Sequence, residues 1–126
     1  MTTRIINRTR DNVVCERTEV AANLVRRVRG LLGRSGLEPG QGMLFRGESS
    51  IHSAFMRFEF DAVFMDRDLS VLKLAPRIAP WRVRGAKKAR NVLELSAGEI
   101  ERLGIQVGDQ LTVIDDSGGD GDDRQQ

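Results

Sequence analysis

The stretch that decides this fold is SIHSAFMRFEFDAVFMD, residues 50–66 of a chain of 126. It contains the only histidine of the protein, His52, and four of its five phenylalanines. Arg57 and Asp61 lie among these apolar residues, and an unpaired charge is costly to bury. Each charge must therefore find a partner or face a cleft. We expect this stretch to supply both the core and the functional surface.

The composition indicates an ordinary soluble domain. Apolar residues make up 40% of the chain and charged residues 30%, and no run approaches the roughly 18 apolar residues of a membrane span. The polar, arginine-containing N-terminus lacks the apolar centre of a signal peptide. The single cysteine, Cys15, cannot form an internal disulfide, and we expect it to be a small packed residue. These features predict a cytoplasmic protein with no membrane association.

Charge is spread unevenly along the chain. Residues 1–114 contain 19 basic and 13 acidic side chains, whereas residues 115–126 contain one arginine and five aspartates. We predict one domain over residues 1–114 and a disordered acidic tail over residues 115–126. Residues 69–93 contain seven basic side chains and no acidic one: Lys73, Arg77, Arg82, Arg84, Lys87, Lys88 and Arg90. A solvated arm explains this patch most simply.

Short apolar and β-branched runs separated by turn residues predict about seven strands. Residues 4–9 and 13–20 read as a hairpin that turns at Arg10-Asp11-Asn12, and Asp66-Arg67-Asp68 reads as the turn of a second hairpin. The runs that read as strands, eight when the very short run 43–45 is included, are residues 4–9, 13–20, 43–45, 51–58, 60–65, 69–75, 91–95 and 110–114. The two prolines Pro76 and Pro80 favour a long loop over residues 76–90.

Two short helices are predicted between these strands. Residues 21–32 place apolar side chains at helical spacing, and Gly33 is positioned to end that helix. Ser96 and Glu99 have the spacing of a capping box, which predicts a second helix through Leu103. We therefore predict a mostly β (α+β) fold, a compact curled antiparallel sheet that is barrel- or sandwich-like, with the two helices on its rim.

Three blocks of sequence, in this order, resemble the domain of unknown function 192 family of small bacterial and archaeal proteins. The blocks are RGLLGR (29–34) with GMLF (42–45); His52 and FMRF (55–58) with Asp61, Phe64 and Asp66; and VLEL (92–95) with AG (97–98), GI (104–105) and GD (108–109). The resemblance implies a compact β-rich fold and no particular reaction. Relatives often have Trp-Met-Lys-Asn-Thr where this chain has residues 55–59, so Arg57 keeps the positive charge of that motif.

Catalytic and metal sites gain little support from the residues. One histidine and one cysteine cannot supply the usual ligands of zinc, so we predict no metal and no cofactor. A triad of a serine with His52 and Asp61 is possible by composition, but Ser53 and His52 are adjacent on a predicted strand and point apart. His52 and Asp61 remain the candidate acid and base of an alternative enzyme, a hydrolase or a protein acting on carbohydrate or phosphate.

A binding role is the favoured interpretation. Arg57 and Asp61 either form a structural ion pair or belong to a shallow pocket in which Arg57 holds an anionic group. The ligand-binding candidates are His52, Met56, Arg57, Asp61, Arg77, Trp81 and Arg82. Glu94 is interpreted as an ion-pair partner. The sequence thus predicts a non-catalytic module for a small anionic ligand or a protein partner. Weak nucleic-acid binding through residues 73–90 is a further alternative, but one tryptophan supports it little, so nucleic acid is not the expected partner.

Overall fold

The computed structural model of the protein describes residues 3–21, 37–53 and 58–115. These residues form ten strands and one short helix. That helix is too short to cross a membrane, and the described residues contain no other. The elements are β1 (Thr3–Asn7), β2 (Asn12–Cys15), β3 (Arg17–Ala21), β4 (Gln41–Arg46), β5 (Ser50–His52), β6 (Phe60–Met65), β7 (Val71–Ile78), β8 (Val83–Gly85), β9 (Asn91–Ser96), α2 (Glu99–Leu103) and β10 (Leu111–Asp115). The mostly β prediction is confirmed.

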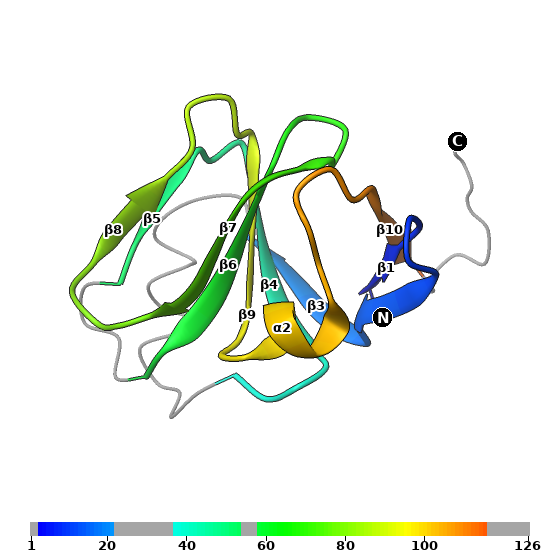
Figure 1. Cartoon of the computed structure of the whole chain (residues 1–126), viewed down its shortest axis with the longest axis horizontal. Helices are drawn as coiled ribbons and strands as arrows, with labels where there is room; N and C mark the ends of the chain where they lie inside the picture. Colours follow the sequence, from blue (N-terminus) through cyan, green and yellow to red (C-terminus); the bar gives the residue numbers. More distant parts are fainter. Residues whose placement is uncertain (1–2, 22–36, 54–57, 116–126) are drawn as a thin grey trace.

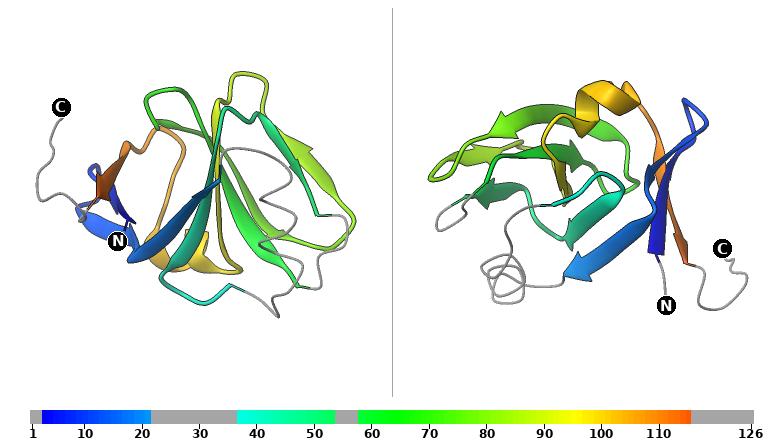
Figure 2. Two further views of the ribbon diagram at one scale, coloured as in Figure 1. Left: turned by 180° about the vertical axis from the view of Figure 1, so that it is seen from behind. Right: turned by 90° about the horizontal axis from the view of Figure 1, so that it is seen from below.

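The strands form three sheets. A five-stranded sheet runs in the order β3-β4-β9-β6-β7, a three-stranded sheet in the order β10-β1-β2, and a separate pair consists of β5 and β8. We call the β5–β8 pair the arm. Figure 1 and both views of Figure 2 show the arm at one end of the five-stranded sheet and the pair of β1 and β10 at the other.

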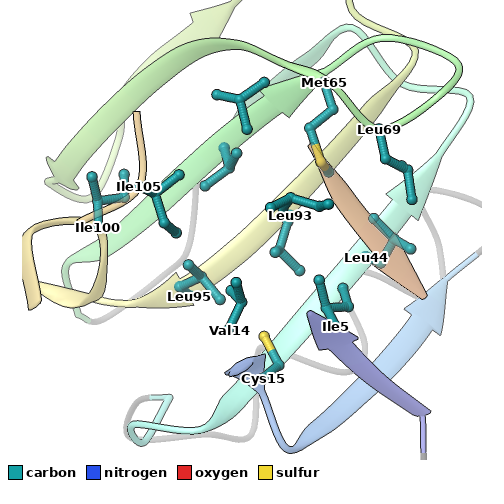
Figure 3. Close-up of a cluster of buried hydrophobic side chains, with 13 residues drawn as sticks. Ile5, Val14, Cys15, Leu44, Met65, Leu69, Leu93, Leu95, Ile100 and Ile105 are labelled. Carbon is teal, nitrogen blue, oxygen red and sulfur yellow. The ribbon is translucent and has the colours of Figure 1, made fainter. Parts of the chain in front are cut away.

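The five-stranded sheet is buried on both faces because its central strands are continuous apolar runs. Side chains alternate between the faces along each strand. Phe60, Ala62 and Phe64 pack in one core cluster with Ile51 of the arm. Val63 of β6 packs in the other cluster, which contains side chains from β1, β2, β10 and α2. Figure 3 shows this second cluster, where Ile5, Cys15, Leu44, Leu93 and Ile100 are among the labelled side chains. The arm and α2 therefore cover opposite faces of the sheet.

Several element predictions are confirmed. Strands β4, β6, β9 and β10 form where short apolar runs predict them, and β1 and β2 form the predicted antiparallel hairpin. Asp66 makes the second predicted turn, because its carboxylate oxygen Oδ1 accepts the backbone N–H groups of Asp68 and Ser70, each at 2.9 Å. A short polar side chain can hold a turn in this way without distant partners, which is why the sequence predicts it well.

Four predicted strand boundaries need correction. The predicted strand 13–20 breaks at Glu16, because β3 leaves the hairpin and pairs in parallel with β4. Strand β7 continues through Pro76 to Ile78, where an edge strand tolerates the missing N–H of proline. Residues 83–85, predicted to lie in a loop, form β8. Asp115, predicted to begin the tail, pairs with Thr3 as the last residue of β10.

The count of seven strands and the barrel-like closure are also wrong. Within the described residues the five-stranded sheet ends at β3 and β7, and neither strand pairs with a further one to close a barrel. The predicted helix 21–32 lies outside the described residues except for Ala21, which belongs to β3. The predicted strand 51–58 is described only through Ser53, and residues 54–57 lie outside the described part of the chain.

Candidate functional site

The segment Arg77–Arg82, which comprises the end of β7 and the connection to β8, has a backbone that bulky residues rarely adopt. Arg77 has a φ of 50° and Trp81 a φ of 64°, so both lie in the left-handed region without being glycine. Such conformations cost on the order of 1 kcal/mol each and persist only where neighbouring groups hold them. We call this segment the clamped loop, because buried polar side chains from other elements fix both of its ends.

Asp61 fixes the first end. Its side chain is fully buried, and its carboxylate accepts the backbone N–H of Arg77 at 2.9 Å. The same carboxylate accepts the N–H groups of Gly98 at 3.1 Å and Ile100 at 2.8 Å, at the start of α2. Three backbone donors compensate the burial of this charge. Asp61 therefore ties β6 to the clamped loop and to α2.

This geometry also corrects the predicted capping box. The N-cap residue of α2 is Gly98, with a φ of 94°, and no side chain of the helix's own turn caps it. Ser96 is instead the last residue of β9, where it pairs with Phe60. The carboxylate of Asp61, 37 residues before Gly98 in the sequence, takes the place that Ser96 was expected to fill.

Ser53 fixes the other end of the clamped loop. Ser53 is fully buried, and its hydroxyl Oγ accepts a hydrogen bond from the backbone N–H of Arg82 at 2.7 Å. The hydroxyl donates to the carbonyl of Ala79 at 2.7 Å, and the carbonyl of Arg82 lies farther away at 3.3 Å. The backbone of Ser53 adds an N–H donated to Arg82 at 2.8 Å and a carbonyl that accepts from Trp81 at 3.0 Å. The last turn of the loop is therefore held against the end of β5.

The clamped loop and the arm present apolar and basic side chains to solvent. Trp81 is 63% exposed and Val83 is 70% exposed. Arg82 is also exposed, and its guanidinium Nη1 lies 3.3 Å from the carbonyl oxygen of Trp81 and 3.4 Å from that of Pro80. Arg84 donates from its Nη1 to the carbonyl of Val83 at 2.8 Å. Within the described residues neither guanidinium pairs with a carboxylate, so both retain donors for an anion.

Lys73 adds a further positive charge beside the arm. It extends from β7, and its Nζ donates to the carbonyl of Gly85 in β8 at 2.7 Å. The same ammonium lies 5.9 Å from the centre of the Phe64 ring. The basic side chain therefore bridges the edge of the five-stranded sheet to the arm.

His52 lies in β5 directly opposite Val83 and is half-buried. The adjacent Ser53 side chain points to the other face of the strand, and its hydroxyl is engaged by the clamped loop. Asp61 is likewise engaged by backbone N–H groups at the start of α2. Ser53 and Asp61 therefore bond to backbone groups that hold the loop and α2. A catalytic triad would instead need the carboxylate to orient the histidine.

Five of the seven predicted ligand-binding residues are described, and they fall into two groups. His52, Trp81 and Arg82 come together at the junction of the arm and the clamped loop, whereas Asp61 lies beneath Arg77 on the α2 side. The guanidinium Nη2 of Arg77 lies on that side too, 3.2 Å from the position that a Cβ would take on Gly98. Met56 and Arg57 lie outside the described residues, so the proposed Arg57–Asp61 ion pair stays a prediction.

Two buried residues of this region carried no local signal of their role. The sequence marks Ser53 only as a candidate nucleophile. Its structural role is hidden because its hydrogen-bond partners Ala79 and Arg82 are 26 and 29 residues away. Glu94 was interpreted as an ion-pair partner, and the structure places it fully buried on the arm side of the sheet, between Met43 and Ala62. Burial and face assignment depend on strand register, which local sequence does not determine.

Two further candidates are a metal site and the Cys15 thiol. Among the described residues no group of three or more His, Cys, Asp or Glu side chains could hold a metal ion. Burial raises the pKa of the Cys15 thiol to about 12, and a hydrogen bond with Thr18 offsets this only in part while the Glu99 carboxylate adds to it. A thiol with such a pKa remains protonated at neutral pH and is a poor nucleophile.

Comparison with known proteins gives a family and a shared fold. Residues 5–113 match the model of the family DUF192, described as "Uncharacterized ACR". The UPF0127 protein of Pyrococcus abyssi is 30% identical over 105 residues, which cover 78% of this chain and 86% of that protein. The UPF0127 protein of Pyrococcus furiosus is 30% identical over 114 residues, covering 85% and 95%.

Two crystal structures share the fold. A protein of Sinorhizobium meliloti 1021, described as a "putative transcription regulator", superposes with a TM-score of 0.75 at 26% identity, covering 88% of this chain and 91% of that one. A protein of unknown function from Novosphingobium aromaticivorans superposes with a TM-score of 0.73 at 24% identity, covering 87% and 82%. Neither comparison names a reaction, so the function has to be argued from the site.

Proposed function

Because this chain belongs to the DUF192 family of uncharacterised proteins, its role rests on its own geometry, and we propose that it is a non-catalytic binding module for an anionic ligand. The binding surface is the exposed side of the clamped loop and the arm. The observation that carries this proposal is the clamped loop itself. Two non-glycine residues, Arg77 and Trp81, are held in left-handed backbone by buried Asp61 and Ser53.

Strain of this kind supports a functional role because it clusters at binding sites; among the described non-glycine residues it occurs otherwise only in the turns at Asp11 and Leu69. Glycine would adopt the backbone at the Arg77 and Trp81 positions without steric strain. The chain instead has an arginine and its only tryptophan there, and it uses two buried polar side chains to keep them in place. Preorganised side chains bind with a smaller loss of conformational entropy than mobile ones.

An anionic ligand fits the charge of this surface. Arg82, Arg84 and Lys73 are exposed, and within the described residues their side chains contact backbone carbonyls and, for Lys73, the Phe64 ring. No acidic residue occurs between Leu69 and Leu93 to neutralise them. Arginine binds phosphate and carboxylate groups through paired N–H donors, which gives geometric selectivity as well as attraction. Arg57 is proposed to add to this site, as the sequence predicts.

The enzyme alternative, with His52 and Asp61 as acid and base, has less support. A catalytic carboxylate must reach a substrate, whereas Asp61 is fully buried and accepts three backbone N–H groups. The description of the Sinorhizobium meliloti relative as a "putative transcription regulator" applies to that protein, and it fits a binding role better than a catalytic one.

A thermal-shift experiment tests the proposal. The wild type, Arg82→Gln and the control Arg67→Gln, an exposed arginine in the β6–β7 turn, are melted with inorganic tripolyphosphate, citrate and chloride at equal ionic strength. A ligand present at a hundred times its Kd stabilises the folded state by about 2.7 kcal/mol, which raises the Tm by roughly 10 °C. We expect tripolyphosphate to raise the Tm of the wild type and of Arg67→Gln, and to raise that of Arg82→Gln less. Equal shifts in all three proteins would contradict the proposed site.

A further inference from the structure

We propose that the anionic partner is single-stranded nucleic acid, with an unpaired base stacked on Trp81 and the neighbouring phosphates bound by basic side chains of the clamped loop, of β8 and of the turn after it. This inference rests on the proposed function and names its ligand. It combines two properties of the surface that anion binding alone does not require: an exposed aromatic ring on a fixed backbone, and positive charge distributed over the clamped loop, β8 and the turn that follows β8.

The aromatic ring is placed to serve as a stacking platform. Trp81 is 63% exposed, and its backbone N–H is held by the carbonyl of Ser53 at 3.0 Å. The adjacent Arg82 is fixed by the Ser53 hydroxyl. A ring that is both open to solvent and anchored at its backbone binds a flat partner without first being ordered. Stacking of bases on aromatic side chains tolerates any base sequence, because every base has a π face.

The positive charge is distributed rather than concentrated. Exposed basic residues lie in the clamped loop, in β8, in the turn after it and on the neighbouring β7: Arg82, Arg84, Lys87, Lys88 and Lys73. A single phosphate would be held by two or three converging donors, as in helix-terminal or nest-like anion sites. Charges spread along a segment that contains no acidic residue between Leu69 and Leu93 fit a chain of phosphates instead.

An exposed apolar side chain completes the surface. Val83 is 70% exposed and lies opposite His52 on one face of the arm, whereas Arg84 lies opposite Ile51 and leaves β8 on the other face. A bound strand would therefore run along the β8 edge, which both side chains flank. The Val83 side chain could pack against the sugar or base next to the one that is stacked on Trp81, which would favour binding. It contributes nothing to binding a small inorganic anion.

The surface favours an unpaired strand over duplex DNA and over an acidic peptide. Bases in a duplex are stacked on one another, so the Trp81 ring cannot reach a base face without unstacking the helix. An acidic peptide offers carboxylates to the arginines, but it does not supply flat rings at regular intervals to match the tryptophan. Duplex and peptide are therefore the competing occupants in the experiment.

The test uses fluorescein-labelled strands and full-length protein. Anisotropy is measured with an oligothymidylate, an abasic strand of the same length, a duplex of that length and poly-glutamate. The proteins are the wild type, Trp81→Ala, Arg82→Gln and two controls, Arg67→Gln and Val107→Ala. Val107 is 63% exposed, as Trp81 is, but it lies in the turn before β10. The abasic strand keeps the phosphates and removes only the stacking.

We expect the wild type to bind the oligothymidylate more tightly than the abasic strand. Trp81→Ala should lose roughly tenfold in affinity for the oligothymidylate and none for the abasic strand. Arg82→Gln should weaken binding of both strands and lower the slope of log K against log salt by about 1. The two control variants should bind as the wild type does.

The outcomes separate this inference from the proposed function. Equal affinity for the abasic strand and the oligothymidylate would overturn base stacking while leaving anion binding intact. Tighter binding of the duplex or of poly-glutamate would overturn the choice of partner. If no polyanion binds at low salt and tripolyphosphate leaves the Tm unchanged, both the inference and the proposed function are wrong.

Discussion

Ser53 and Arg82 are 29 residues apart in the sequence, yet each accepts a hydrogen bond from the backbone of the other. The Arg82 N–H donates to the Ser53 hydroxyl at 2.7 Å, and the Ser53 N–H donates to the Arg82 carbonyl at 2.8 Å. One buried residue at the end of β5 thus fixes the segment that carries Trp81. This relationship makes Ser53 a positioning residue for the proposed site.

Replacing Ser53 with alanine should therefore loosen the clamped loop. The change removes the acceptor of the Arg82 N–H and the donor to Ala79, which should lower the free energy of unfolding by about 1–2 kcal/mol. Acrylamide quenching of the single tryptophan should increase, because Trp81 would move more freely. Urea denaturation and quenching measure the two effects, with the exposed Ser49→Ala as control. Unchanged quenching in a destabilised Ser53→Ala would show that Ser53 does not order the loop.

Replacing Asp61 should damage two elements at once. Asp61→Ala leaves the backbone N–H groups of Arg77, Gly98 and Ile100 without their acceptor, which should cost about 3 kcal/mol or more. Asp61→Asn keeps one acceptor oxygen and should cost less. The exposed Asp68→Asn, in the β6–β7 turn, is the matched control. Equal urea midpoints for Asp61→Ala and Asp68→Asn would refute the capping role.

Gly42 in β4 is predicted to be intolerant of a methyl group. A Cβ built there would lie 2.5 Å from the sulfur of Cys15 and 3.3 Å from Cδ1 of Leu93. Gly42→Ala should therefore lower the free energy of unfolding by about 1–3 kcal/mol through overpacking. Cys15→Ala removes the sulfur, so the double variant should lose less stability than the sum of the two single variants. Strictly additive losses, measured by urea denaturation, would mean that the Cys15 sulfur is not the obstacle.

Asp109 should make stability depend on pH in the acid range. Burial alone would raise its pKa, but hydrogen bonds from Arg10, Asn7 and Gln106 outweigh it and lower the pKa below the ordinary value. A carboxyl group whose pKa is lower in the folded state stabilises the protein above its unfolded pKa of about 3.9. This contribution is lost as pH falls from about 4 through the folded pKa.

The matched variants for this prediction are Asp109→Asn and Asp68→Asn. Asp109→Asn removes the titrating group, so the free energy of unfolding should fall less steeply with pH in that acid window than it does for the wild type. Asp68→Asn should retain the steep wild-type dependence. Parallel pH profiles for the wild type and Asp109→Asn, from urea denaturation at a series of pH values, would argue against the lowered pKa.

The sequence predicts those parts of the fold that depend on local pattern. The apolar run of β6 and the Asp66 turn are read directly, because periodicity and turn chemistry act over a few residues. The start of α2 is misread, since the capping group is the carboxylate of Asp61 from a strand far away in the sequence. Strand β3 is likewise misread as an arm of the hairpin, because its partner β4 lies beyond residues 22–36.

The candidate site is predictable in part for the same reason. The exceptional composition of the Ser50–Asp66 stretch and of the basic segment points to His52, Trp81 and Arg82, which the structure places at one junction. What the sequence does not reveal is that Asp61 supports the loop from the opposite face of the sheet. The face of the sheet on which the Asp61 side chain lies follows from strand register, and a shift of one residue would move it to the other face.

The most informative single measurement is a titration of the protein with inorganic tripolyphosphate, followed by the emission of Trp81. The chain has one tryptophan and no tyrosine, so the signal comes from the clamped loop alone. If the loop and arm bind an anion, emission should change saturably in the wild type and in Arg67→Gln, and the midpoint should move to higher concentration in Arg82→Gln. An emission that stays constant while tripolyphosphate stabilises the protein would place the anion site elsewhere and contradict the proposed function.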